Sequence, residues 1–80
     1  MKTYNLHKKY HARAWDAIDE GDYHIALAAV GVMRDLLMQA RAEEGLAPAL
    51  LEEMEGDYIN TLAMAHDIAR YADNQTEWGY

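Results

Sequence analysis

The residues EGDYHIALAAVGVM, at positions 20–33, hold both a chain reversal and the most apolar run in this sequence of 80 residues. Gly21 and Asp22 form a turn signal, because glycine often ends a helix and aspartate often starts one. The nine residues from Ile25 to Met33 are apolar on nearly every side of a helix. Such a helix needs neighbours in more than one direction, so we expect it between two other helices or in an interface with a second copy.

Two further segments with helical periodicity flank this central one. Apolar residues recur at four-residue steps before it and at seven-residue steps after it. These positions are Leu6, Tyr10, Ala14 and Ile18 in the first segment, and Leu51, Tyr58 and Ala65 in the third. The turn signal EEGLAP at 43–48 separates the central and third segments. We therefore predict helices at about 3–20, 23–43 and 48–72.

The pattern predicts an all-α fold, an up-down-up three-helix bundle. We expect a single helical domain over residues 1–72 and a polar C-terminal tail over 73–80. Domains of this size are marginally stable alone and often gain stability by association. We therefore expect a homo-oligomer formed through the residues from Ile25 to Met33.

Four local features refine this expectation. Asp22 is a predicted N-cap, and Arg41 lies where a positive charge complements the dipole of the central helix. Gly31 is interpreted as a packing notch that lets another helix approach closely. Gly56 lies inside the third segment, but the apolar stripe continues in phase across it, so we expect one unbroken helix.

Composition narrows the classes of function. Lys and Arg number 7 against 14 Asp and Glu, for a formal net charge of −7, so we expect no direct nucleic-acid binding. The chain has no cysteine, which excludes thiol chemistry and fits a cytoplasmic location, and no run is apolar enough for a membrane helix. It has no serine, and three short helices hardly enclose a catalytic pocket. We expect no enzyme and no cofactor.

A short internal repeat accompanies a resemblance to one protein family. The tetrapeptide Glu-Gly-Asp-Tyr at 20–23 recurs at 55–58. Residues 10–30, with this turn and the small residue Ala26 after it, resemble a tetratricopeptide hairpin. The resemblance implies a helical hairpin with a peptide-binding groove and no catalysis. The second copy departs from the pattern, because Thr61 replaces the small residue and Pro48 interrupts the preceding helix.

Charge is unevenly distributed along the chain. Residues 1–13 carry four basic residues and no acidic one, whereas residues 14–80 carry three basic and fourteen acidic residues. Either the basic start meets the acidic body of a second copy, or the acidic body presents carboxylates to a basic partner. A third interpretation is a solvated face with ion pairs along the first helix. The pairs with suitable spacing are those of Lys9 or Arg13 with Asp16 and Glu20.

An acidic cluster closes the first predicted helix. Carboxylates are unfavourable at a helix C-terminus, so binding is the more attractive explanation for this cluster. The aromatic residues near the C-terminus are further candidate anchors, unless the tail folds back over the bundle. The predicted partner-binding residues are Asp16, Asp19, Glu20, Asp22, Trp78 and Tyr80.

These observations predict a small non-enzymatic interaction protein. Its acidic body would bind, and inhibit or adapt, a partner protein with a basic surface, including one that itself binds nucleic acid. The carboxylates would then imitate nucleic-acid phosphates. Small acidic helical proteins of this kind are common among phage-encoded inhibitors of host machinery, an analogy that rests on size and charge.

The basic and aromatic stretch at 7–13 supports an alternative function. Cationic side chains hold phosphates and aromatic rings stack on bases, so the stretch could bind a small anion or a nucleotide. The residues of this alternative site are His7, Lys8, Lys9, Tyr10, His11 and Arg13.

Two histidines in the same stretch have the spacing of metal ligands. His7 and His11 lie four residues apart, on one face of a helix. A complete site needs further ligands, and the other histidines, His24 and His66, are far away in the sequence. We therefore predict no metal centre, and the sequence leaves open whether an ion binds at this pair.

Overall fold

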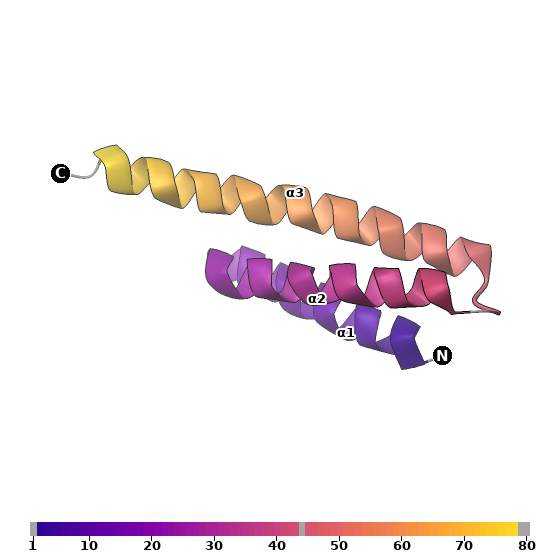
Figure 1. The fold of residues 1–80 in the computed structure, drawn as a ribbon. Coiled ribbons are helices and arrows are strands. Elements are labelled where there is room, and N and C mark those ends of the chain that lie inside the picture. The colour runs from indigo at the N-terminus through magenta and orange to yellow at the C-terminus, as the bar shows by residue number, and fades with distance from the viewer. Residues whose placement is uncertain (1, 44, 79–80) are drawn as a thin grey trace.

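The protein is an all-α three-helix bundle with up-down-up topology (Figure 1). The computed structural model describes the backbone of residues 2–43 and 45–78 and the side chains of residues 2–43 and 45–71. Helix α1 spans Lys2–Glu20, α2 spans Tyr23–Ala42 and α3 spans Pro48–Trp78. The first and third helices run in the same direction, and every pair of helices is in contact. The predicted fold class is confirmed.

The reversal between α1 and α2 follows the predicted turn chemistry. Gly21 has a φ of +76°, its N–H donates to the carbonyl of Ile18, and the N–H of Asp22 donates to the carbonyl of Ala17. This pair of bonds is the Schellman motif that ends many helices at glycine. Asp22 then starts α2, because its Oδ1 accepts from the N–H of Ile25 at 3.2 Å. Both the turn and the N-cap are confirmed.

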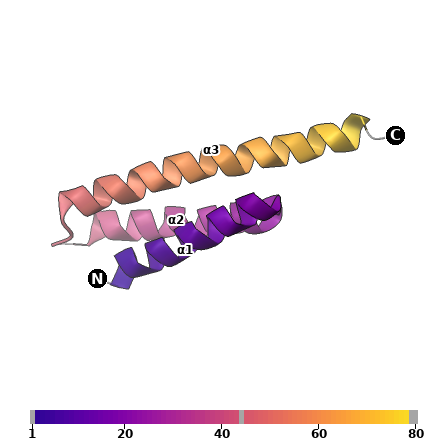
Figure 2. The same ribbon diagram turned by 180° about the vertical axis from the view of Figure 1, so that it is seen from behind.

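Helix α3 is longer than the sequence pattern indicated. It passes through Gly56 without a break, as expected, but it ends at Trp78 instead of 72. The residues between 72 and 78 are polar, yet they include neither glycine nor proline, so nothing in this stretch forces a helix to end. As a result α3 extends beyond the turn that joins α1 and α2 (Figures 1 and 2).

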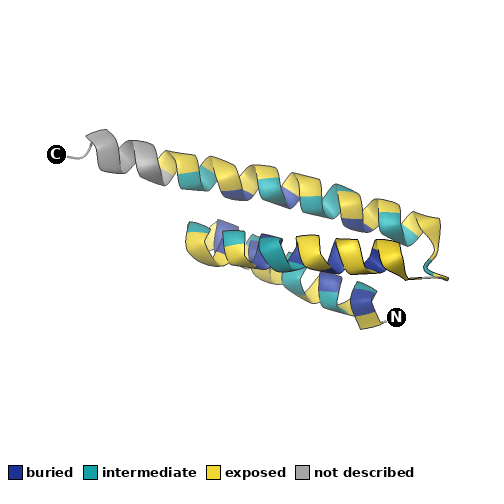
Figure 3. Cartoon of the chain, in the orientation of Figure 1, coloured by how far each residue is buried: buried dark blue, intermediate teal, exposed yellow. Residues whose placement is uncertain are grey.

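The core runs along the axis between the three helices (Figure 3). Toward the α1–α2 turn it is lined mostly by small side chains, which allow close helix approach. Toward the other end, larger side chains of α2 meet α3. The buried residues of the first part are Ala14, Ala17, Ile18, Ala26, Ala29, Val30, Met33 and Ala65, and those of the second are Leu36, Leu37, Ala40 and Met54.

Of two further features predicted for α2, the position of Arg41 is confirmed and the packing notch at Gly31 is not. Arg41 lies in its last turn, as expected, and forms an ion pair with Glu55 of α3 at 3.3 Å. The prediction of a packing notch at Gly31 is wrong, because a Cβ added there would meet nothing within 4 Å. Gly31 therefore faces open space and creates no close helix approach.

None of the helices in the described part of the chain combines the length and the apolarity that crossing a membrane requires.

Candidate functional site

Three of the four carboxylates in the acidic cluster at the end of α1 are exposed and have no partner among the described residues. Asp16, Asp19 and Glu20 are all exposed, whereas Asp22 is partly buried as the cap of α2. Among the described residues, none of the three exposed carboxylates has an ion-pair or hydrogen-bond partner. The ion pairs along α1 that would have explained them as an ordinary solvated face are not formed.

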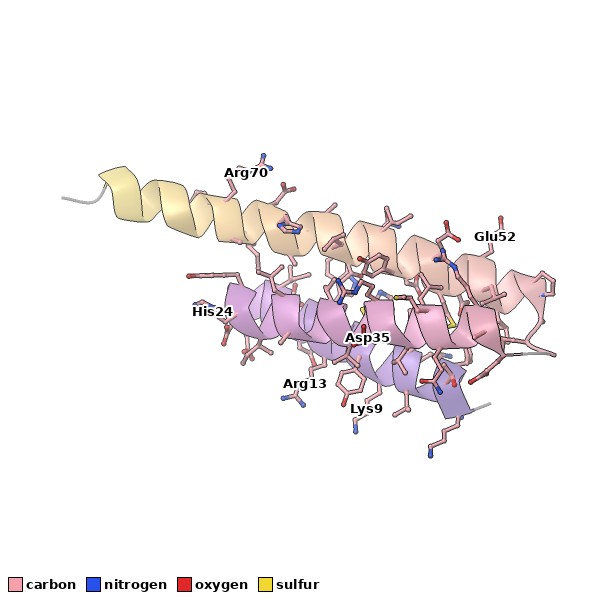
Figure 4. The ribbon with its side chains drawn as sticks, in the orientation of Figure 1. Lys9, Arg13, His24, Asp35, Glu52 and Arg70 are labelled. Carbon is pink, nitrogen blue, oxygen red and sulfur yellow. The ribbon has the colours of Figure 1, made fainter. Side chains whose placement is uncertain are left out.

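Lys8, Lys9 and Arg13 of α1 form no ion pair with a carboxylate in the described part of the chain. Lys8, Lys9 and Arg13 are exposed, and Lys9 and Arg13 project from α1 on the side away from α3 (Figure 4). The ammonium of Lys8 lies 5.4 Å from the ring of Tyr4, and that of Lys9 lies 5.8 Å from the ring of Tyr10. These contacts leave the positive charges available to an anion.

A shallow hollow of about 310 Å³ lies between α1 and α2, beside these cations. Arg13 and Tyr10 supply its polar groups, and small or aliphatic side chains of α2 supply its floor. It is lined by Tyr10, Arg13, Ile25, Ala28, Ala29 and Val32. Of the predicted anion-binding stretch, therefore, only Tyr10 and Arg13 line this hollow.

The two histidines of that stretch point elsewhere, toward α3. The side chain of His7 is fully buried, and its Nε2 lies 3.0 Å from Oδ2 of Asp57. The Nδ1 of His11 lies 3.7 Å from the same carboxylate oxygen. One carboxylate of α3 thus faces two imidazoles of α1, and the structure separates these imidazoles from the exposed lysines.

The indole of Trp15 determines which nitrogen of His11 carries the proton. Its Nε1–H donates to Nε2 of His11 at 3.0 Å, so Nε2 is the accepting nitrogen and the ring proton is on Nδ1, facing Asp57. The Nδ1 of His7, by contrast, is buried and has no hydrogen-bond partner in the part of the chain that the structure describes. Trp15, His11, Asp57 and His7 therefore form a continuous polar network between α1 and α3.

Tyr4 extends this network by one turn of α1. Its hydroxyl donates to Glu53, one turn before Asp57 on α3, and its ring stacks on that of His7 with centroids 6.5 Å apart. The hydrogen bond to Glu53, followed by burial and the nearby negative charges, raises the pKa of Tyr4 above its usual value of 10.0.

Sequence reasoning missed Asp57 as the partner of the histidine pair. It looked to His24 and His66, which are both exposed and lie outside the cluster. Asp57 also belongs to the second Glu-Gly-Asp-Tyr tetrapeptide, which was interpreted only as an internal repeat of residues 20–23 and lies within α3. The sequence offered one signal for this contact, the predicted parallel direction of the first and third helices. In parallel helices, residues near the start of one lie close to residues near the start of the other.

The aromatic anchors predicted at Trp78 and Tyr80 lie outside the residues whose side chains the structure describes. Comparisons of the chain with known protein families, with curated proteins and with solved structures find no match.

Proposed function

We propose that this chain is a small, non-enzymatic interaction protein that binds a basic surface on a partner protein. The observation that carries the proposal is the exposed cluster of Asp16, Asp19 and Glu20, whose carboxylates have no partner among the described residues. Unpaired carboxylates at a helix C-terminus repel the dipole of their own helix. A cationic partner would relieve this cost on binding.

The charge of the whole chain supports the same kind of partner. A net charge of −7 repels nucleic acid and attracts a cationic protein surface over a Debye length, which accelerates association at low salt. The partner class that fits is a cytoplasmic protein with a basic surface, including one that normally binds nucleic acid. Binding there would block or adapt that surface, as phage-encoded inhibitors of similar size and charge do.

The test is capture of the partner, followed by a matched comparison of variants. The tagged protein is incubated with nuclease-treated lysate of its source cells at low and high salt, and captured proteins are identified by mass spectrometry. The affinity of the captured protein is then measured for D16N/E20Q and for E52Q/D67N. Both variants remove one Asp and one Glu charge, and Glu52 and Asp67 are exposed carboxylates of α3.

We expect D16N/E20Q to lose at least about tenfold in affinity and E52Q/D67N to lose much less, because only the first pair lies in the contact. Equal affinities in the two variants would contradict the assignment of this surface.

The hollow between α1 and α2 favours a second candidate function, the binding of a small anion or nucleotide. Arg13 and Tyr10 line it over an aliphatic floor, with the ammonium of Lys9 against the Tyr10 ring. Titration with pyrophosphate and with ATP tests this function. We expect R13Q to abolish binding and R70Q, which changes an exposed arginine of α3, to leave it intact.

Self-association through α2 is also part of the proposal, but over fewer residues than the sequence predicted. Four residues of the stretch from Ile25 to Met33 are buried within one chain and are not available to a second copy: Ala26, Ala29, Val30 and Met33. Of the residues that stay exposed or partly exposed, Ile25, Ala28 and Val32 line the hollow.

A further inference from the structure

We propose that His7, His11 and Asp57 form a binding site for a divalent transition-metal ion of the zinc class. This inference is independent of the proposed partner surface, because the three residues lie between α1 and α3 and the acidic cluster lies at the exposed end of α1.

The spacing of the donor atoms supports the site. One donor atom from each of the three residues lies within 4.8 Å of the others, with 3.0 Å from His7 to Asp57 and 3.7 Å from His11 to Asp57. Ligand atoms that each lie about 2.0–2.2 Å from one ion are separated by roughly 3.0–3.5 Å in octahedral or tetrahedral coordination. An ion therefore fits between these atoms with small side-chain rotations.

The donor chemistry specifies the class of ion. Two imidazoles and one carboxylate suit zinc and its neighbours in the transition series, whereas calcium and magnesium require a shell of oxygens. The carboxylate also supplies the negative charge that offsets part of the charge of the ion. Among the described residues no fourth protein ligand joins the group, so water completes the coordination shell.

The surroundings hold the ligands in place on one side and admit an ion on the other. The side chain of His7 is 0% exposed, whereas those of His11 and Asp57 are 31% and 29% exposed. The two imidazole rings are nearly parallel, with centroids 5.8 Å apart, as their four-residue spacing on α1 requires. The ion would enter from the side of His11 and Asp57.

Trp15 gives the site a distinctive property. To bind metal through Nδ1, His11 must move its ring proton to Nε2, which then can no longer accept the hydrogen bond from the indole. Binding through Nε2 of His7 also displaces the hydrogen bond to Asp57, because the proton on that nitrogen must move to the buried Nδ1, which has no partner among the described residues. Metal binding therefore competes with both hydrogen bonds, and removing the indole N–H removes one of the competitors.

The experiment is isothermal titration of the full chain with Zn²⁺, supported by the visible absorption of Co²⁺ as a probe of coordination. We expect H11Q and D57N each to weaken Zn²⁺ binding at least about tenfold. The matched controls are H24Q and H66Q, which remove exposed histidines outside the cluster. Circular dichroism confirms that each variant is folded at the titration temperature.

Unchanged Zn²⁺ affinity in H11Q or D57N would overturn the proposal, as would loss of binding in H24Q or H66Q, which would reveal adventitious capture by surface histidines. Absence of Zn²⁺ binding by the unmodified chain would overturn it as well.

A second variant tests the geometry without removing a ligand. We expect W15F to bind Zn²⁺ about fivefold more tightly, because the hydrogen bond from the indole to His11 is absent. Long-range ¹H–¹⁵N spectra should show the ring proton of His11 on Nδ1 without metal and on Nε2 with Zn²⁺. Unchanged or weaker affinity in W15F, or an unchanged proton position, would overturn coordination through Nδ1.

Discussion

The buried ring of His7 and the carboxylate of Asp57 lie 3.0 Å apart, although 50 residues separate them in the sequence. This contact joins the first and third helices, which are not consecutive in the chain. A buried polar group is costly without a partner, so the bond favours the register of α1 against α3 in which the two residues meet.

Replacing Asp57 with alanine should lower the free energy of unfolding by about 1–3 kcal/mol. The reason is that Nε2 of His7 would lose its hydrogen bond to Asp57, while its Nδ1 already lacks a partner among the described residues. Urea unfolding followed by circular dichroism measures the change. The matched control is D67A, which removes an exposed aspartate of α3 and should stay within about 0.5 kcal/mol of the unmodified protein.

Replacing Gly31 or Gly56 with alanine should stabilise the protein by about 1 kcal/mol in each case. Both glycines lie inside helices, and a Cβ at either position would meet nothing within 4 Å. Alanine therefore removes the entropic cost of helical glycine without a clash. Thermal unfolding of the two single variants and of the double variant checks the gain.

The control for this prediction is Gly21→Ala. Its position also has open space around it, but its φ of +76° is unfavourable for any residue with a Cβ. We expect this variant to lose about 1–2 kcal/mol, and a gain there would contradict the conformational explanation.

The contribution of Tyr4 to stability should disappear in alkaline solution. Because the pKa of Tyr4 is raised in the folded chain, its protonated hydroxyl favours folding at every pH below the usual value of 10.0. As the pH rises through the folded pKa, the hydroxyl ionises and the bond to Glu53 is lost. We expect the stability difference between the unmodified protein and Y4F to be constant below pH 10.0 and to shrink above it. A difference that grew with alkalinity would contradict the assigned direction.

If copies of the chain associate through α2, Ile25 should control the equilibrium. Its side chain is 43% exposed and lines the hollow between α1 and α2. We expect I25Q to shift the protein toward monomer in sedimentation velocity runs. The matched control is M38Q, which removes a 60% exposed side chain of the same helix away from the hollow. Equal shifts in the two variants would exclude the hollow as the interface.

The architecture was predictable because local signals agree with each other. Glycine and an aspartate cap mark the α1–α2 turn, and the apolar stripe of α3 stays in phase across Gly56. The end of α3 was missed because polar residues do not by themselves terminate a helix. The tetratricopeptide resemblance of residues 10–30 stays a prediction.

The cluster around Asp57 could not be predicted, for a different reason. The spacing of His7 and His11 shows that they share a face, but it does not show which residue of another helix faces them. That depends on the register between two parallel helices, which is set by packing over the whole bundle. The same limit applies to Gly31, whose surroundings decide whether a missing side chain makes a contact possible or leaves a space.

The hydrogen bond between Trp15 and His11 would also allow the fluorescence of the indole to report on the state of the imidazole. The indole donates to a nitrogen whose lone pair is no longer available once the ring proton of His11 moves from Nδ1 to Nε2. Any event that occupies that nitrogen changes the surroundings of the excited indole, so the emission of Trp15 would follow the state of the ring without an attached dye. The chain contains one other tryptophan, Trp78, and its replacement by phenylalanine would isolate this signal.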